Sequence, residues 1–350
     1  MHPFNNSVDS RRNDFQPTNH FLDTATIGIP PVEAVRAMGT TLRQWQDGTL
    51  DVKAIDQTIR SSCENFAKII ATDPTNVGIL SQVSTASAIM AASLPQGAKV
   101  LVAKEDFTSV IFPFLVLENL GKLEVVAVDL DRVVETISPS FDLVAVSSVQ
   151  SSDGRLIDLQ GLSQQCKEHG VKSFVDVTQS AGWLATSADD FDVVACHGYK
   201  WLCSPRGTGF IVIRPSARKW LVPILGGWYS GEDPWDSIYG PPLRLASDAR
   251  AFQVSPDWLS WSATQVSTKL LSELGPQEIG RHNVDLANYF RSELGISPSN
   301  SAIVSVDCTS TPETLRDSGI VASFRDGKLR TCFHLYNTHE DANALLKVLA

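Results

Sequence analysis

The stretch that decides the fold spans residues 174–202. It begins with FVDVTQSAG at 174–182 and ends with FDVVACHGYKWL at 191–202. Each half is a short apolar run that gives way to polar residues, which is typical of a buried parallel strand and the loop after it. Because ligands of open α/β sheets bind outside the carboxyl ends of such strands, we expect Asp176 and Lys200 at the same edge of one sheet.

The segments on both sides extend this pattern. Short apolar runs alternate with helical stretches from about residue 77 to residue 215. The strand candidates are 77–80, 99–103, 123–128, 143–147, 172–177, 193–196 and 209–213, and the helix candidates between them include 85–93, 109–119 and 159–169. This alternation predicts βαβ units and a mainly parallel sheet.

The remainder of the chain has a different texture. Residues 1–20 are polar, and we expect them to be flexible. Helical periodicity predicts helices at 32–45, 50–71, 257–274 and 279–294, and the tail from 302 to 350 reads strand, helix, strand, strand, helix. We therefore predict a large α/β domain at 21–256 and a smaller α+β domain at 257–350. The irregular, aromatic segment 221–256 is long enough to suggest a functional loop.

Composition excludes several classes of protein. The 350 residues are 43% hydrophobic and 19% charged, as in globular proteins, and the net charge of −10 disfavours nucleic acid or an anionic membrane as partner. The six cysteines form no CxxC pair and no zinc-binding spacing, so we expect no metal site. The polar N-terminus does not resemble a signal peptide and no apolar run could span a membrane, which predicts a cytoplasmic enzyme with reduced thiols.

An amine and a carboxylate at one sheet edge suit pyridoxal 5'-phosphate (PLP). Lys200 would form the Schiff base, and Asp176 would keep the pyridine nitrogen protonated. The amine must lose its proton to act as a nucleophile, which burial beside a cationic ring favours. The alternatives are a surface lysine and a helix-capping aspartate. The apolar strand before Lys200 and its neighbours Tyr199 and Trp201 argue against the first, and the matched distance between Asp176 and Lys200 argues against the second.

Several ordered motifs resemble the class V aminotransferase family from about Phe21 to the C-terminus. They are LDTA at 22–25, GTG at 207–209 after the lysine, and RTCFHLYNTHED at 330–341. That family contains PLP-dependent enzymes of fold type I, among them cysteine desulfurases, kynureninase and isopenicillin N epimerase. The resemblance implies a PLP-binding large domain and an amino-acid or amine substrate. A non-catalytic relative and a module for another phosphorylated ligand remain as alternatives.

The resemblance assigns cofactor contacts. Gln179 would hydrogen-bond the phenolic oxygen, although a solvated turn residue is the alternative. Ser84 and Thr85, at a helix start, would cradle the phosphate with His197, although such residues also serve simply as caps. Phe107 would stack on the cofactor ring, where desulfurases carry a histidine.

Three further positions follow from the same resemblance. Ser148 would lie near a cofactor oxygen, with Gln150 as an alternative. Ser255 would reach the phosphate of a neighbouring subunit, which implies a homodimer with shared active sites; a plain turn serine is the alternative. Arg330 would bind the substrate carboxylate as a bidentate pair. Arg244 and Arg250 are rival candidates for that role.

The sequence narrows the reaction without fixing it. The run GIVASFRDGKL at 319–329 leads straight into Arg330, with no cysteine and no room for the loop that carries the desulfurase nucleophile. A persulfide-forming desulfurase is therefore disfavoured. Aminotransferase-type chemistry is favoured, with β-elimination, including C–S lyase activity, or epimerisation as alternatives. Epimerisation requires a second base, for which Cys196, Tyr199 and Tyr229 are candidates.

Overall fold

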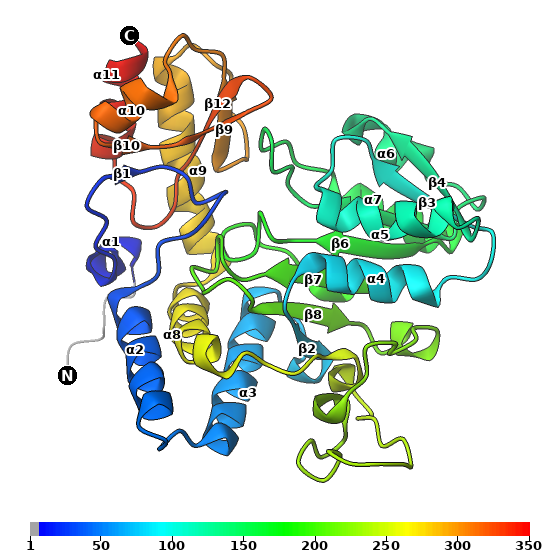
Figure 1. The fold of residues 1–350 in the computed structure, drawn as a ribbon. Helices are drawn as coiled ribbons and strands as arrows, with labels where there is room; N and C mark the ends of the chain where they lie inside the picture. The colour runs from blue at the N-terminus through cyan, green and yellow to red at the C-terminus, as the bar shows by residue number, and fades with distance from the viewer. Residues whose placement is uncertain (1–6) are drawn as a thin grey trace.

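The computed structural model describes residues 7–350 and is built around a seven-stranded sheet (Figure 1). The spatial order of the strands is β2-β8-β7-β6-β5-β3-β4. They are β2 (Val77–Leu80), β3 (Ala98–Ala103), β4 (Leu123–Val128), β5 (Leu143–Ser147), β6 (Lys172–Asp176), β7 (Val193–His197) and β8 (Gly209–Ile213). β8 runs antiparallel to its neighbours β7 and β2, and every other pair is parallel. All seven predicted strands and the mainly parallel sheet are confirmed.

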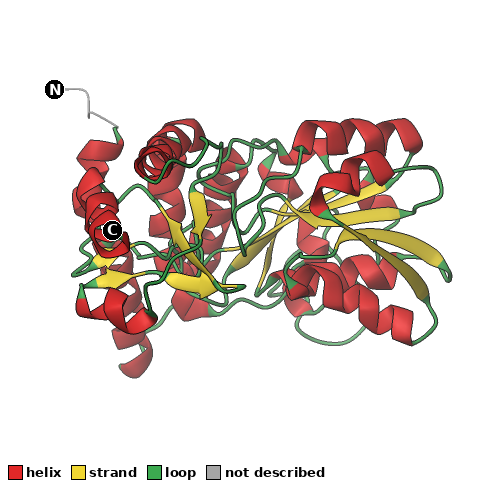
Figure 2. Cartoon of the chain, turned by 90° about the horizontal axis from the view of Figure 1, so that it is seen from above, coloured by secondary structure: helices red, strands yellow, loops and turns green. Residues whose placement is uncertain are grey.

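Helices cover both faces of this sheet, as the view from above shows (Figure 2). α4 (Val83–Ser93) and α5 (Thr108–Asn119) pack on one face, and α3 (Val52–Ile69) and α7 (Leu159–His169) on the other. Alternate residues of a strand point to opposite faces. In β5, Val144 and Val146 accordingly join the core under α3 and α7, while Leu143 and Ala145 join the core under α4 and α5.

The remaining long helices also match their predictions. They are α2 (Val32–Gln46), α8 (Trp258–Leu274) and α9 (Pro276–Glu293). α8 packs against α2 and α3, so the chain after residue 257 first contributes to the covering of the large sheet. The domain boundary at 257 stays a prediction.

A second, smaller sheet lies at the other end of the molecule. Its order is β11-β12-β9, and all its pairs are antiparallel. It is formed by β9 (Ile303–Val306), β11 (Ser323–Arg325) and β12 (Lys328–Cys332), accompanied by α10 (Pro312–Asp317) and α11 (His339–Leu349). The tail also contains a two-residue strand, β10 (Ile320–Val321), which pairs in parallel with β1 (His20–Phe21). Sequence periodicity missed this pairing because two residues carry no periodic signal.

Part of the N-terminal segment is ordered. α1 (Val8–Arg11) and a 3-10 turn at Arg12–Asp14 precede the buried Phe15, whose ring centroid lies 5.3 Å from that of Tyr336. The flexibility of residues 1–20 stays a prediction, although the apolar side chains of Val8 and Phe15 are buried in the core. Residues 1–6 lie outside the described residues. Segment 221–256 is irregular, as expected, with short 3-10 turns at Trp228–Ser230 and Ala249–Phe252.

Candidate active site

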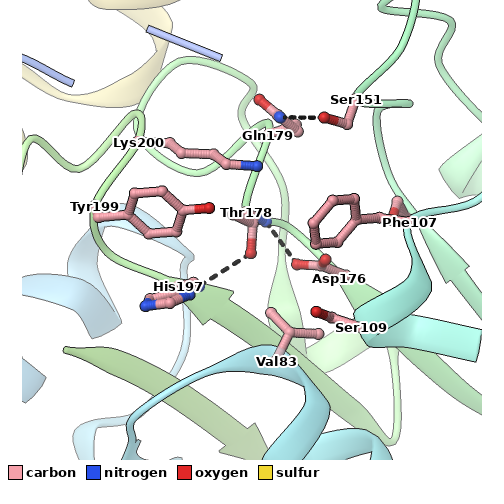
Figure 3. Close-up of a pocket in the computed structure, with 11 residues that line it drawn as sticks. Val83, Phe107, Ser109, Ser151, Asp176, Thr178, Gln179, His197, Tyr199 and Lys200 are labelled. Carbon is pink, nitrogen blue, oxygen red and sulfur yellow. Dashed lines mark hydrogen bonds between the residues drawn. The ribbon is translucent and has the colours of Figure 1, made fainter. Parts of the chain in front are cut away.

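Asp176 is the last residue of β6 and lies at the base of a pocket at the carboxyl edge of the main sheet (Figure 3). The side chain is buried, and the backbone N–H of Thr178 donates to Oδ1 at 2.8 Å. Burial raises the pKa of this carboxyl to about 6, against the hydrogen bonds from Thr178, which lower it. The hydrogen bonds from the protein therefore do not fully offset the cost of burying the charged form of Asp176.

Lys200 enters the same pocket from the loop after β7. Its amine is buried, and burial lowers its pKa to about 8, while Asp176 acts in the opposite direction. Within residues 7–350 no ion pair joins the two groups. The loop backbone is held by Gly28, whose N–H donates to the Tyr199 carbonyl at 2.9 Å. A Cβ at Gly28 would lie 2.0 Å from the Lys200 carbonyl oxygen, so any larger residue there would displace the lysine.

Phe107 covers the Lys200 amine, which lies 5.1 Å from the centre of its ring. Phe107 is 44% exposed and lines the pocket, so its side chain is accessible to a ligand there. Asp106 holds it in place: this carboxylate accepts from the N–H groups of Phe107, at 2.7 Å, and Ser147, at 2.6 Å. It thereby ties the start of α5 to the end of β5. Sequence reasoning missed this role of Asp106, because the contact joins residues 41 positions apart.

His197 lines the pocket as a neutral imidazole. Its Nε2 accepts a hydrogen bond from the N–H of Gly207 at 3.3 Å, which places the ring proton on Nδ1. The pKa of His197 is lowered to about 4. Burial is the largest cause, and repulsion from the cations of Arg206 and Lys200 lowers the pKa further. The Nδ1–H group can therefore donate to an anion without bringing a charge.

Gln179 also lines the pocket, but its amide is fully engaged by the protein. Nε2 donates to the Ala25 carbonyl at 3.0 Å and to Ser151 Oγ at 2.9 Å, and Oε1 accepts from Trp201 Nε1 at 2.8 Å. Neither N–H of this amide is free for a cofactor oxygen. The predicted contact with the phenolic oxygen is therefore not available in this conformation, because three groups from distant parts of the chain occupy the amide.

Arg330 on β12 is 1% exposed and does not line the pocket. It forms an ion pair with Asp23 at 3.2 Å, and its other hydrogen bonds reach Ser323, Thr26, and the carbonyl and hydroxyl of Ser151. These contacts use all five of its N–H groups. A carboxylate role for Arg330 stays a prediction, and it would require one of these contacts to be exchanged.

The rival arginines lie elsewhere. Arg250 pairs with Asp248 and Glu232, and Arg244 donates to the Tyr239 carbonyl. Neither residue lines the pocket that contains Lys200.

Some of the other predicted residues lie at the pocket and others do not. Ser84 and Thr85 lie in the first turn of α4, which reaches the pocket through Val83. Ser148 faces away: its hydroxyl contacts Ser180 Oγ and the Asp176 carbonyl, and Ser147 lines the pocket instead. Ser148 directly follows the last residue of β5, and its contact with a cofactor oxygen stays a prediction.

Ser255 and Gln150 are also outside the pocket. Ser255 is exposed, and Gln150 is fully buried, with its side chain beside the Asp106 carboxylate. The pocket also contains polar residues that sequence reasoning did not assign to the cofactor or substrate, namely Ser109, Ser147, Ser151, Thr178 and Tyr199. Each of them ends or follows a strand, or begins a helix, at this edge of the sheet, and that position in the sequence was the signal that could have found them.

The comparisons with known proteins identify the family. Residues 39–314 match the Aminotransferase class-V family, and the chain belongs to it. The family consists of PLP-dependent enzymes, so the predicted family and cofactor are confirmed. The chain is 26% identical over 324 residues to "Uncharacterized aminotransferase YcbU" of Bacillus subtilis (strain 168), covering 87% of this chain and 86% of the relative. It is 25% identical over 284 residues to isopenicillin N epimerase of Streptomyces clavuligerus, covering 75% and 69%.

Solved structures confirm the fold. The cystine C–S lyase C-DES, in complex with its product cysteine persulfide, superimposes with a TM-score of 0.85 at 20% identity, covering 95% of this chain and 97% of that one. Cysteine desulfurase from Thermococcus onnurineus NA1 does so with a TM-score of 0.84 at 19% identity, covering 97% and 96%. The chain therefore has the fold type I architecture that the sequence predicted.

The residues of the pocket fit PLP. A buried carboxylate and a buried amine face the same space without pairing, as a ring with a cationic nitrogen and an electrophilic carbon requires. The accessible side chain of Phe107 suits an aromatic ring, and the start of α4 with His197 suits a phosphate. Across residues 7–350, no group of three or more His, Cys, Asp or Glu side chains could hold a metal ion, and no helix is long and apolar enough to cross a membrane.

Proposed function

We propose that this protein catalyses aminotransferase-type chemistry on an amino acid or amine, with Lys200 holding PLP covalently. The observation that carries the proposal is the pair of buried groups, Asp176 and Lys200, which line one pocket, have pKa values shifted in opposite directions, and are joined by no ion pair within residues 7–350. Bound between them, the cofactor would act as an electron sink for a carbanion at the substrate Cα.

The chain's own residues would divide the work. Burial favours the neutral amine of Lys200, which would accept the Cα proton and return it to the cofactor's C4' carbon. Asp176 would hold the proton on the pyridine nitrogen by its charge. Phe107 would pack on the ring and keep water from one face. The phosphate would be bound by N–H groups at the start of α4, assisted by Ser84, Thr85 and the Nδ1–H of His197.

Epimerisation is the second candidate. Of the three proposed second bases, Tyr199 lines the pocket, with its ring centre 5.5 Å from the Lys200 amine. Cys196 is buried away from it, and Tyr229 donates to Asp56 outside it. The similarity to isopenicillin N epimerase also supports this reading.

Elimination requires no second base, so a C–S lyase remains an alternative. A persulfide-forming desulfurase stays disfavoured. Among the described residues that line the pocket there is no cysteine, and β11 and β12 are joined by a tight turn at 326–327.

A product test separates these reactions. The holoprotein is mixed with a panel of L-amino acids, with and without a 2-oxo acid as amino acceptor. Transamination predicts a new amino acid and the 2-oxo acid of the donor, without ammonia. Ammonia with a 2-oxo acid would indicate elimination, and racemisation with loss of the Cα hydrogen to solvent would indicate epimerisation. Either outcome would replace the aminotransferase proposal.

We also infer a homodimer with shared active sites. Phe112 and Val116 on α5, the helix that follows Phe107, and Leu120 at its C-cap form an exposed apolar stripe, with exposures of 57%, 56% and 64%. Such a stripe favours burial against another protein surface. Ser255 is exposed and lies outside its own chain's pocket, which is compatible with a contact across the dimer.

Light scattering tests the dimer. Val116→Glu should place a charge in the interface and yield a monomer with reduced activity, whereas Glu124→Gln, at an exposed position on β4, should remain a dimer. A wild-type monomer with full activity would refute the proposal.

A further inference from the structure

Arg325 is the last residue of β11 and is exposed, and within residues 7–350 no carboxylate forms an ion pair with it. Its Nη1 donates to the Phe324 carbonyl at 2.7 Å, and its Nη2 donates to Thr26 Oγ1 at 3.1 Å. A guanidinium has five N–H groups, and these contacts use two of them. Arg325 can therefore still bind an anion through the others.

A second cation lies at the same hydroxyl. Arg330 Nη2 also donates to Thr26 Oγ1, and Arg330 forms its ion pair with Asp23. Among the described residues, Asp23 is thus the one carboxylate that pairs with either guanidinium. Burial is the largest cause of the lowered pKa of Arg330, and the cation of Arg325 lowers that pKa further. The cluster contains one positive charge more than its carboxylate balances, so an anion would be stabilised there.

The hydroxyl of Thr26 supplies another donor. A guanidinium has no acceptor, so Arg325 and Arg330 can only donate to Thr26 Oγ1, and together they fill the two acceptor positions of this oxygen. The hydroxyl proton can then only be donated, and it has no acceptor among residues 7–350. The N–H groups of Arg325 and the O–H group of Thr26 are therefore neighbouring donors, which suits the two oxygens of a carboxylate.

Thr26 belongs to a segment that runs along the candidate active site. The Ala25 carbonyl accepts from Gln179 Nε2 at 3.0 Å, and the N–H of Gly28 donates to the Tyr199 carbonyl at 2.9 Å. Gln179 and Tyr199 both line the pocket (Figure 3). Thr26 lies between these two contacts, so the surplus positive charge is located beside the pocket.

The position of Arg325 favours one kind of carboxylate. Arg325 does not line the pocket itself. The α-carboxylate of an amino acid is attached to the reacting carbon and must stay close to Lys200, whereas an acidic side chain reaches further. We propose that Arg325, together with Thr26, binds the side-chain carboxylate of the substrate, which is therefore an acidic amino acid of the aspartate or glutamate type. The inference rests on the proposed function and names its substrate class.

Three variants of the holoprotein test the proposal. Arg325→Gln removes the charge, and Arg325→Lys keeps it. Lys328→Gln is the matched control, because it removes an exposed cation from the other strand of the same hairpin, where Lys328 pairs with Asp307 at 3.2 Å. Cofactor content and the urea midpoint show that each variant is folded.

The measured quantity is the half-saturating concentration of an amino acid, obtained from the change in visible absorbance of the bound cofactor. L-Aspartate is compared with L-asparagine, and L-glutamate with L-glutamine. Each amide keeps the α-carboxylate and lacks only the acidic side chain. The ratio within a pair therefore reports the side-chain carboxylate alone.

We expect the wild-type protein to bind at least one of the two acids more tightly than its amide. Arg325→Gln should reduce this preference about 10-fold, through the loss of a charge-assisted hydrogen bond. Arg325→Lys should keep part of the preference, because a point charge attracts a carboxylate without forming the bidentate pair. Lys328→Gln should match wild type.

The proposal is overturned if the wild-type protein prefers neither acid, or if Lys328→Gln lowers the preference as much as Arg325→Gln. Equal weakening of acid and amide in Arg325→Gln would also overturn it, because Arg325 would then act on the α-carboxylate. A failure of the proposed function would look different, since the wild-type protein itself would carry no borohydride-reducible PLP on Lys200.

Discussion

Two buried carboxylates in this molecule are almost equally hidden from solvent but differ in their partners. Asp56, on α3, is 6% exposed and accepts from Tyr229 O–H at 2.9 Å and Trp235 Nε1 at 2.6 Å, one donor for each oxygen. Asp176, at the end of β6, is 5% exposed, and its hydrogen bonds come from Thr178 alone in the described part of the chain.

The difference shows that burial by itself does not mark a functional carboxylate. Asp56 is satisfied by aromatic donors and anchors the irregular segment 221–256 to α3, which is a structural task. Asp176 accepts only from Thr178 within residues 7–350 and retains capacity for a further partner, and no ion pair in that range joins it to Lys200. Mutation of Asp56 should therefore change the stability of the protein, whereas mutation of Asp176 should change the chemistry of the bound cofactor.

Lys200→Ala should produce the largest effect. Without the amine no covalent link to PLP can form, so activity should be abolished and the visible absorbance of the bound cofactor should change. Borohydride reduction and peptide mapping of wild type should place the pyridoxyl label on Lys200. Lys53, which lies 5.2 Å above the Trp235 ring in the other region, supplies the control. Lys53→Ala should retain label and activity, and a label on any other lysine would reject the assignment.

Because Lys200 is buried, the free energy of unfolding of the apoprotein should depend on pH. Burial lowers the pKa of this amine from 10.5 to about 8, so the unfolded chain binds more protons between these values. Stability should therefore rise with pH from about 8 to 10.5, by on the order of 3 kcal/mol. Lys200→Met should be more stable than wild type at pH 7, and the difference should shrink toward pH 10. Urea unfolding at both pH values measures it, and a constant difference would contradict the buried-amine assignment.

Asp176→Asn should separate chemistry from folding. An amide cannot hold the pyridinium proton by charge, and the loss of one charge-assisted interaction is worth about 1.5–3 kcal/mol, or about one to two decades in rate. The unfolding midpoint of the apoprotein should not fall, because the carboxylate is poorly satisfied without ligand. Unchanged kinetics would remove Asp176 from the proposed mechanism.

Asp56→Asn should show the reverse pattern. The amide nitrogen would face a donor, either Tyr229 or Trp235, and an unmet buried donor costs about 1–3 kcal/mol. We expect a lower urea midpoint with unchanged kcat per folded molecule and unchanged cofactor content. A loss of activity without a loss of stability would mean that the two regions are coupled.

A comparison of the predicted and observed elements shows which features of the structure can be read from local sequence patterns. The main strands were predictable, because each is a local apolar run such as 209–213, bounded by polar or glycine residues. The pairing of β1 with β10 was not, because it joins residues 300 positions apart through two residues on each side. Phe107 and Lys200, which the sequence placed at one site, line the same pocket, whereas the hydroxyl of Ser148 contacts Ser180 and its neighbour Ser147 lines the pocket.

The sequence by itself determined the family, the main sheet, and the delivery of Asp176 and Lys200 to one edge, because all three depend on local patterns and on the rule that parallel strands present their carboxyl ends together. Only the tertiary structure decided which polar groups remain available there. Gln179 is engaged by Ala25, 154 positions away, and Arg330 by Asp23, 307 positions away. Hydrogen-bond partners are set by proximity in space, and a side chain that finds them within the protein has none left for a ligand.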